Sequence, residues 1–370
     1  MSEPAVKPAA GRLKAAQIVG NAKLGGVISC VLNYYEHMDR SRFRFDFFTY
    51  GPSDLDERLR ALDPDARVFY IPPLDRAFYR AVPALRKLLK EGGYSVAHSH
   101  MTTLSAFALY AAKGAGVPVR ICHAHSTFDK DTDHYRIKAL LRPFAAKCAT
   151  HLMACGEKAA ENLYRGRAKE AYILPNAIDL ARFSPPQAET QAAPPEELLF
   201  VGRFAYQKNL PFLLRAFARA RASRRMRLTL VGDGTERGQL ESLAASLRIT
   251  ESVRFIPPCD PAPYYREADL FVLPSRYEGL PVVGLEAQAT GLPCLYSDKV
   301  DRGADVSGTG IFLPLDEEVW AEAMLSPHKK DPDGGLKLRA AGYDICEQAD
   351  RLEKFYAAAL RENAGDKVNI

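Results

Sequence analysis

The stretch that most constrains the fold runs from Asp269 to Asp298, DLFVLPSRYEGLPVVGLEAQATGLPCLYSD. The apolar run 270–273 predicts a strand. After a loop, Pro281 stands where a helix over 282–290 should begin, because proline fits the first helical turn. A glycine and a proline end that helix, and a second strand is expected over 294–297. This βαβ unit predicts a parallel sheet, which binds ligands at the carboxyl ends of its strands.

The loop and helix of this unit carry two carboxylates, Glu278 and Glu286. The backbone amides around Gly279, Leu280 and Val282 lie at the start of the helix, where amides and the helix dipole favour an anion such as a phosphate. A ligand that has both phosphates and hydroxyls would suit the amides and the carboxylates together. A nucleotide sugar is such a ligand.

A cationic turn opens the second half of the chain. The sequence 198–209 predicts a strand that ends at Gly202, followed by Arg203 and Lys208 and then a helix. Arginine binds phosphate oxygens in a fork, and lysine adds a mobile point charge. If the sheet is parallel, both cations share the ligand edge with Glu278; two ordinary surface cations are the alternative.

The N-terminal half begins with a strand over 15–19, then Gly25 and Gly26 before a helix over about 27–38. Glycine lets a backbone approach a phosphate closely, although such turns also use glycine for packing alone.

Two further strands, 95–100 and 120–127, end in His-x-His. Alternation predicts His98 and His100 on one face and His123 and His125 on another. Four imidazoles could form a zinc site, but buried, hydrogen-bonded histidines are the favoured interpretation because no further ligand cluster accompanies them.

Two stretches, 76–90 and 134–152, are basic and amphipathic. The first carries five cations and the second four, neither contains an aspartate or glutamate, and both are expected to be helical. Such helices can lie on an anionic bilayer, and an ordinary solvated helix face is the alternative.

Composition limits the class of protein. A chain of 370 residues with 47% hydrophobic content is long enough for two domains. No run of eighteen apolar residues and no secretory signal is found, and seven scattered cysteines indicate reduced thiols and a cytoplasmic location. The net charge of +5 suits an anionic ligand or an acidic membrane surface, and no nucleic-acid partner is expected.

The pattern S-x-x-E-G-L-P-V-V-x-x-E-A-x-A-x-G-x-P, from Ser275 to Pro293, resembles the signature of retaining glycosyltransferases of family 4. This resemblance implies the α/β GT-B fold, two Rossmann-like doubly wound domains that face each other across a cleft. The domains are expected over 1–185 and 198–344, with a proline-rich linker over 186–197. The last helix, within about 345–370, is expected to cross back onto the first domain.

The resemblance also implies roles for the candidate site residues. Glu278 would bind the hydroxyls of the donor sugar, and Glu286 would bind the ribose. Arg203 and Lys208 would stabilise the departing diphosphate, together with the amides of Gly279 and Leu280 and the turn at Gly25 and Gly26. His125 would place a polar group over the reacting sugar as a catalytic residue, with His100 the weaker candidate. No metal or other cofactor is expected.

The expected function is transfer of a sugar from a nucleotide-diphosphate sugar, UDP rather than GDP, to a glycan or lipid-linked saccharide. The closing sequence 342–356 resembles the capsule and exopolysaccharide branch of bacterial surface polysaccharide synthesis. Peripheral attachment to the inner face of the cytoplasmic membrane is a further expectation. The alternatives are a nucleotide-sugar epimerase on the same fold and a catalytically inactive partner of another transferase. After Asp298 many family members carry a glycine-rich loop and another acid, whereas this chain has a different sequence over 298–310. The resemblance therefore does not identify the hexose that is transferred.

Overall fold

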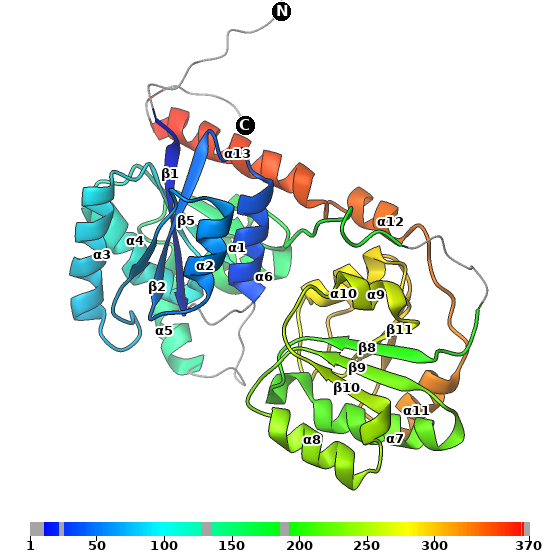
Figure 1. The fold of residues 1–370 in the computed structure, drawn as a ribbon. Coiled ribbons are helices and arrows are strands. Elements are labelled where there is room, and N and C mark those ends of the chain that lie inside the picture. The colour runs from blue at the N-terminus through cyan, green and yellow to red at the C-terminus, as the bar shows by residue number, and fades with distance from the viewer. Residues whose placement is uncertain (1–10, 22–25, 127–134, 186–191, 364, 366–370) are drawn as a thin grey trace, which may run out of the picture. The chain divides into compact units, whose positions relative to one another are not determined.

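The computed structural model describes residues 11–21, 26–126, 135–185, 192–363 and 365. They fall into two compact units, one formed by residues 1–177 with 345–370 and the other by residues 178–344. Each unit is built on one parallel sheet with helices between the strands (Figure 1). The predicted fold class, two Rossmann-like units, is therefore confirmed. Residues 186–191 of the expected linker lie outside the described residues.

The first unit has a seven-stranded sheet in the order β3-β2-β1-β4-β5-β6-β7. Its strands are β1 (Leu13–Asn21), β2 (Phe43–Tyr50), β3 (Val68–Tyr70), β4 (Val96–Ser99), β5 (Val119–Ala124), β6 (His151–Ala154) and β7 (Ala171–Ile173). Its helices are α1 (Gly26–His37), α2 (Leu55–Leu62), α3 (Phe78–Gly92), α4 (Ser105–Gly114), α5 (Tyr135–Ala145), α6 (Glu157–Tyr164) and α13 (Ile345–Asn363), with 3₁₀ turns η1 (Thr102–Leu104) and η2 (Arg165–Glu170).

Alternating residues of the central strands pack on the two faces of the sheet. Ala15, Val96 and Val119 are buried on the face that α1 and α13 cover, together with Tyr356 of α13. Ala16 and Ile18 lie on the opposite face of the sheet, where they pack under α3 and α4. Because both faces are covered, the strands read as nearly continuous apolar runs.

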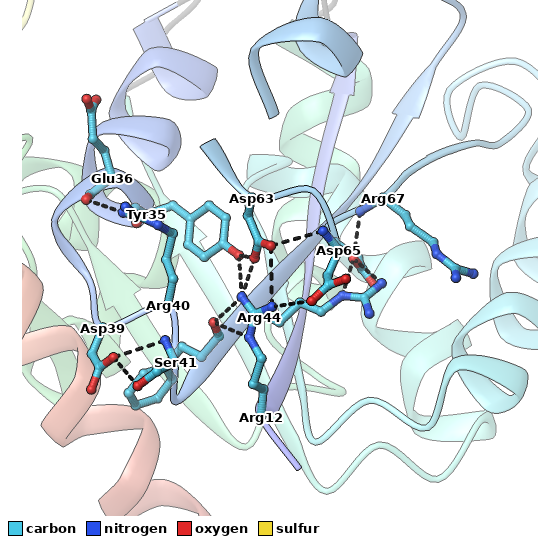
Figure 2. Close-up of polar contacts among 12 residues, drawn as sticks. Arg12, Tyr35, Glu36, Asp39, Arg40, Ser41, Arg44, Asp63, Asp65 and Arg67 are labelled. Atoms are coloured by element: carbon cyan, nitrogen blue, oxygen red, sulfur yellow. Dashed lines mark hydrogen bonds and ion pairs between the residues drawn. The ribbon is translucent and has the colours of Figure 1, made fainter. Parts of the chain in front are cut away.

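A polar network fastens the start of β1 to the segments around it (Figure 2). The Arg12 guanidinium pairs with the buried carboxylate of Asp63, and it also contacts Asp65 at 3.2 Å and the carbonyl oxygen of Phe43 at 3.1 Å. The Tyr35 hydroxyl donates to the same Asp63 carboxylate. Burial acts to raise the pKa of Asp63, but the hydrogen bonds from Arg12 and Tyr35 outweigh it, so the pKa is lowered.

The second unit has a six-stranded sheet in the order β10-β9-β8-β11-β12-β13. Its strands are β8 (Glu197–Val201), β9 (Arg227–Val231), β10 (Val253–Ile256), β11 (Leu270–Leu273), β12 (Cys294–Ser297) and β13 (Gly310–Leu313). Its helices are α7 (Leu210–Ser223), α8 (Arg237–Ser246), α9 (Ala262–Glu267), α10 (Val282–Ala289), α11 (Glu317–Leu325) and α12 (Gly334–Ala340), with 3₁₀ turns η3 (Tyr206–Lys208), η4 (Thr250–Ser252) and η5 (Arg302–Ala304). The chain's single tryptophan, Trp320, is fully buried in this core.

The strand order of each sheet reverses at one place, between β1 and β4 in the first unit and between β8 and β11 in the second. The connections on either side of such a point leave in opposite directions, so a crevice opens at the carboxyl ends of the two strands. These two switch points are where ligand sites are expected.

Candidate functional site

The switch point of the second unit brings the predicted cation and carboxylate together. Lys208 follows β8 and Glu278 follows β11, and the ammonium Nζ lies 2.8 Å from the carboxylate Oε2. Their side chains are only 14% and 17% exposed. Gln207 also donates to Glu278 Oε2, at 3.3 Å. Lys208 and Glu278 are 70 positions apart in the sequence, and they meet because β8 and β11 are neighbours in the sheet.

The two loops are held to each other by contacts besides this ion pair. The amide N–H of Arg276 donates to the carbonyl of Gln207 at 2.8 Å, and the Gln207 side chain donates to the carbonyl of Tyr277 at 3.0 Å. The Arg276 guanidinium lies 4.4 Å from the ring centroid of Tyr206, at cation–π distance. The position of Glu278 is therefore set by backbone contacts as well as by Lys208.

A buried side-chain amide fixes the segment that follows β12. Gln288 of α10 donates to the carbonyl of Ala304 at 2.7 Å and accepts from the amides of Val306 and Ser307 at 2.7 and 2.9 Å. Each of these contacts is within hydrogen-bonding distance, so this buried group is well satisfied. The segment after β12 is thus anchored to the helix that carries Glu286.

Glu286 lies on the second turn of α10, within the helix predicted for it. The Tyr265 hydroxyl is 2.9 Å from Glu286 Oε2 and 2.9 Å from the carbonyl of Val283, so one proton is shared between two acceptors. Burial raises the pKa of Glu286 to about 7, although the hydrogen bond from Tyr265 acts in the opposite direction. This carboxyl group therefore changes its charge near neutral pH.

Arg203 is exposed directly after Gly202, at the end of β8. Gly202 itself has φ +152°, and a Cβ placed on Gly232 would lie 1.9 Å from the carbonyl oxygen of Gly202. The glycine at 232 is thus required for two strand ends to approach each other.

The remaining candidate positions for phosphate binding are backbone positions. Gly279 is exposed, and Leu280 is half-buried against the core of the second unit. A Cβ added at Gly279 or at Gly26 would meet no atom within 4 Å, so packing does not require glycine at either position. Gly26 begins α1, and Gly25 lies outside the described residues.

The switch point of the first unit holds all four predicted histidines in one cluster. His98 Nε2 lies 3.0 Å from His123 Nδ1, and His100 Nδ1 lies 2.7 Å from His125 Nε2. The prediction of two separate faces was wrong. In the parallel pairing of β4 with β5, His98 is opposite Ile121. Paired residues point to the same face of a sheet, and so do the residues two positions further along each strand. His123 therefore lies on the same face as His98 and His100.

The cluster is completed by Gln17 of β1 and Tyr356 of α13. The Tyr356 hydroxyl lies 2.8 Å from His98 Nδ1, and Gln17 Oε1 lies 2.8 Å from His100 Nε2. Burial lowers the pKa of all four histidines, and that of His125 falls to about 4 although nearby Asn176 acts to raise it. The four rings are therefore neutral at pH 7.

His98, His100 and His123 have ring nitrogens within 4.8 Å of one another, a spacing that a metal ion could use. The closest nitrogens are however already joined in the hydrogen-bonded pairs His98–His123 and His100–His125. No carboxylate or thiolate joins this group among the described residues. The donor set fits a hydrogen-bonded network better than a zinc site, which would need the facing lone pairs free.

The reasoning from sequence missed four residues of these sites: Gln17, Gln207, Tyr265 and Tyr356. A glutamine inside the apolar run AAQIV was a usable signal, because a buried polar group needs a partner. Tyr356 gave no local signal, since it lies 339 positions from Gln17.

One helical layer of the first unit carries exposed apolar side chains among cations. The large exposed side chains are Phe78, Tyr79, Tyr110, Ile137, Leu140 and Phe144, and we call this the α3–α5 surface. Beside it lies a pocket of about 460 Å³ whose lining includes Arg142, Lys147, Arg165 and Arg167.

The second basic stretch forms a shorter helix than predicted. α5 ends at Ala145 rather than near 152, because Pro143 stands in its last turn and β6 begins at His151. Among the helices that the structure describes, none is long and apolar enough to cross a bilayer.

Comparison with known proteins places both units in one group of enzymes. Residues 24–182 match the family model described as Glycosyltransferase Family 4, and residues 195–329 match the model described as Glycosyl transferases group 1. EpsF of Bacillus subtilis (strain 168), described as a glycosyltransferase, is 36% identical over an alignment of 337 residues, and the match covers 83% of this chain and 85% of EpsF. An Escherichia coli UDP-Gal:alpha-D-GlcNAc-diphosphoundecaprenol alpha-1,3-galactosyltransferase is 28% identical over 79% of this chain and 81% of its own length.

Solved structures share the fold at low sequence identity. Anabaena Alr3699/HepE in complex with UDP and glucose superposes with a TM-score of 0.75 at 15% identity, covering 94% of this chain and all of that one. WaaG, a glycosyltransferase involved in lipopolysaccharide biosynthesis, superposes with a TM-score of 0.61 at 19% identity, covering 96% and 100%. On the strength of the matched family models and the extent of the likeness to EpsF, the chain belongs to glycosyltransferase family 4 and is a glycosyltransferase.

Proposed function

We propose that this protein is a retaining glycosyltransferase that uses a nucleotide-diphosphate sugar, a UDP-sugar rather than a GDP-sugar. The acceptor would be a glycan or a lipid-linked saccharide in bacterial surface polysaccharide synthesis. The observation that carries this proposal is the ion pair between Lys208 and Glu278 at a topological switch point. The two charges neutralise each other, and a donor would offer phosphate to the cation and hydroxyls to the carboxylate.

The leaving diphosphate would be held by Lys208, Arg203 and the amides of Gly279 and Leu280. Negative charge develops on the leaving group as the glycosidic bond breaks, so fixed positive groups at that point lower the barrier. The open space around the missing Cβ of Gly279 supports a close approach of backbone to ligand. Because side chains and amides provide the positive charge, donor binding would need no metal ion.

Glu278 would accept hydrogen bonds from the donor sugar, and Glu286 would accept them from the ribose. Hydroxyl donors favour the ionised form of a carboxyl group. Donor binding would therefore draw Glu286, whose pKa is raised to about 7 by burial, towards its charged state.

The first unit would supply His125 as the polar group over the reacting sugar and the Gly25–Gly26 turn as a phosphate contact. The placement of His125 beside the β1/β4 switch point supports its role. The open space at Gly26 supports backbone contact with an anion.

Two relatives support the choice of donor and acceptor. The name of the Escherichia coli galactosyltransferase gives UDP-Gal as donor and a saccharide on diphosphoundecaprenol as acceptor. The Anabaena structures contain UDP, UDP with glucose, or UDP-glucose.

The proposal is tested by isothermal titration with UDP and GDP, followed by incubation with a panel of sugar nucleotides and lipid-linked acceptors. Glu278→Ala should abolish sugar transfer while UDP still binds. Glu241→Gln is a matched control, because Glu241 pairs with Arg237 at 2.9 Å on an exposed helix of the same unit. Binding of neither nucleotide would favour an inactive partner, and conversion of the donor to an isomeric sugar would favour an epimerase. Near-normal transfer by the Glu278 variant would remove that residue from the site.

We also propose that the α3–α5 surface docks on an anionic membrane, where a lipid-linked acceptor would be available. Exposed Leu140 (71%) and Tyr79 (67%) among arginines and lysines support this proposal, because apolar tips and cations together favour the bilayer interface. Replacing exposed Arg80, Lys87 and Arg136 with glutamine should reduce sedimentation with phosphatidylglycerol vesicles.

The matched control for membrane docking removes the same charge from the other unit. Arg225→Gln, Arg248→Gln and Lys329→Gln change three exposed cations there. Equal losses of vesicle binding in the two triple variants would show that only net charge matters and would refute a specific docking surface.

A further inference from the structure

The four histidines are linked through one side-chain amide. Gln17 is fully buried at the β1/β4 switch point and contacts both halves of the cluster. Its Oε1 lies 2.8 Å from His100 Nε2, and its Nε2 lies 3.2 Å from the Tyr356 hydroxyl. His100 in turn is hydrogen-bonded to His125, and Tyr356 is hydrogen-bonded to His98.

The amide gives this chain of hydrogen bonds a direction. Gln17 Oε1 can only accept, so His100 must carry its proton on Nε2. The Nδ1 of His100 is then an acceptor, and His125 must carry its proton on Nε2 to donate to it. The Nδ1 of His125 is left as a lone pair.

The other half follows by the same rule. Gln17 Nε2 can only donate, so the Tyr356 hydroxyl accepts from it and donates its own proton to His98 Nδ1. His98 then carries its proton on Nε2 and donates to His123 Nδ1, 3.0 Å away. His123 therefore presents an N–H at Nε2.

The series of hydrogen bonds ends on each side at a ring nitrogen that makes no further hydrogen bond. His125 Nδ1 and His123 Nε2 are buried and make no hydrogen bond within the described part of the molecule, and the two ring centroids are 3.9 Å apart. The Asn176 side chain acts to raise the pKa of His125, but it makes no hydrogen bond to Nδ1. The two rings that end the hydrogen-bonded series are thus adjacent, and one carries a free acceptor and the other a free donor. A hydroxyl group, which both donates and accepts, is the complement of such a pair.

Reversing the amide would reverse both ends. With Gln17 turned by 180°, His100 would accept from the amide, His125 would present an N–H, and His123 would present a lone pair. The polarity of the pair is therefore decided by one side chain that touches neither of its two ends.

We propose that Gln17 is the positioning residue that fixes the tautomer of His125, so that Nδ1 is presented as a hydrogen-bond acceptor for a substrate hydroxyl. This inference rests on the proposed role of His125, and it adds the residue through which that role is set. A lone pair at this position can accept a hydroxyl hydrogen bond, whereas an N–H cannot.

The test reads the tautomers directly by ¹⁵N–¹H correlation spectra of the imidazole rings, with the eight histidines assigned by single replacement. In the wild-type protein His100 and His125 should carry their protons on Nε2, as should His98 and His123. Gln17→Met keeps the volume of the side chain and removes both polar atoms, so all four rings should lose their fixed tautomers. Tyr356→Phe should release only His98 and His123, because the contact between Gln17 and His100 remains.

Kinetics connects the tautomer to transfer. Gln17→Met should lower kcat about tenfold or more, as loss of a correctly protonated catalytic group does, with KM for the donor nearly unchanged. Tyr356→Phe should have the smaller effect. Thermal melts of each variant exclude a loss that is due to unfolding.

Three results would overturn the inference. They are a wild-type His125 protonated on Nδ1, a mixture of tautomers at His125, and a single unchanged His125 tautomer in Gln17→Met. Altered tautomers with an unchanged kcat would instead reject the proposed role of His125 while leaving the direction of the hydrogen-bond chain intact. Loss of transfer in the Glu278 variant tests the donor site separately.

Discussion

Glu286 offers a prediction whose magnitude follows from its burial. We expect Glu286→Gln to stabilise the second unit at alkaline pH and to have little effect at acidic pH. In the unfolded chain this carboxyl group ionises near 4.5, whereas in the folded protein burial raises the pKa to about 7. The unfolded state therefore binds fewer protons between these values, and the stability of the wild type falls as the pH rises through them.

The size of the effect is limited by the partial exposure of the side chain. A shift of this size corresponds to at most about 3 kcal/mol. Glu286 is partly exposed, and solvent screening reduces the expected gain of the glutamine variant to about 1–2 kcal/mol above pH 8. Below pH 5 the wild-type side chain is protonated in the folded state, so the two proteins should differ little.

The assay is urea unfolding at pH 5 and pH 8.5, followed by tryptophan fluorescence. Trp320 is the only tryptophan and is buried in the same unit as Glu286, so the signal reports the relevant unfolding step. UDP affinity gives an independent reading: it should fall in the wild type as the pH drops below about 7, because ribose hydroxyls favour the carboxylate, and should vary less in the variant. Equal stability differences at the two pH values would refute the reasoning from burial.

Three further predictions concern the phosphate contacts and the packing. Arg203→Ala combined with Lys208→Ala should weaken UDP binding by several kcal/mol, since charge-assisted hydrogen bonds contribute about 1.5–3 kcal/mol each; calorimetry with unchanged affinity would exclude both residues. Asp63→Asn should destabilise the first unit by about 2–3 kcal/mol at pH 7. Because the pKa of Asp63 is lowered in the folded protein, the difference in stability between wild type and variant should shrink as the pH falls below 3.8, the ordinary pKa of an aspartate. Hydrogen exchange of the first unit measures this difference. Gly232→Ala should destabilise the second unit by more than about 2 kcal/mol, because its Cβ would meet the carbonyl of Gly202; an unchanged urea midpoint by tryptophan fluorescence would contradict the close approach of the two strand ends.

Short-range features of the chain could be predicted from the sequence. The helix expected over 282–290 is observed as Val282–Ala289, and the strands on either side are observed at Leu270–Leu273 and Cys294–Ser297. Apolar period, an initial proline and a terminal glycine act within a few residues, so they are legible without a fold. The fold class was implied by the resemblance of residues 275–293 to the family 4 signature.

The amino-acid sequence by itself determined the βαβ unit, the loop and helix that carry Glu278 and Glu286, and the cationic turn at Lys208. Only the tertiary structure decided that Lys208 meets Glu278, that four histidines share one face, and that burial brings Glu286 close to neutrality. The physical reason is that local periodicity specifies each element, whereas contacts across 70 or 339 positions depend on which strands and helices become neighbours. Solvent exclusion, which sets the pKa values, likewise exists only once those neighbours have packed together.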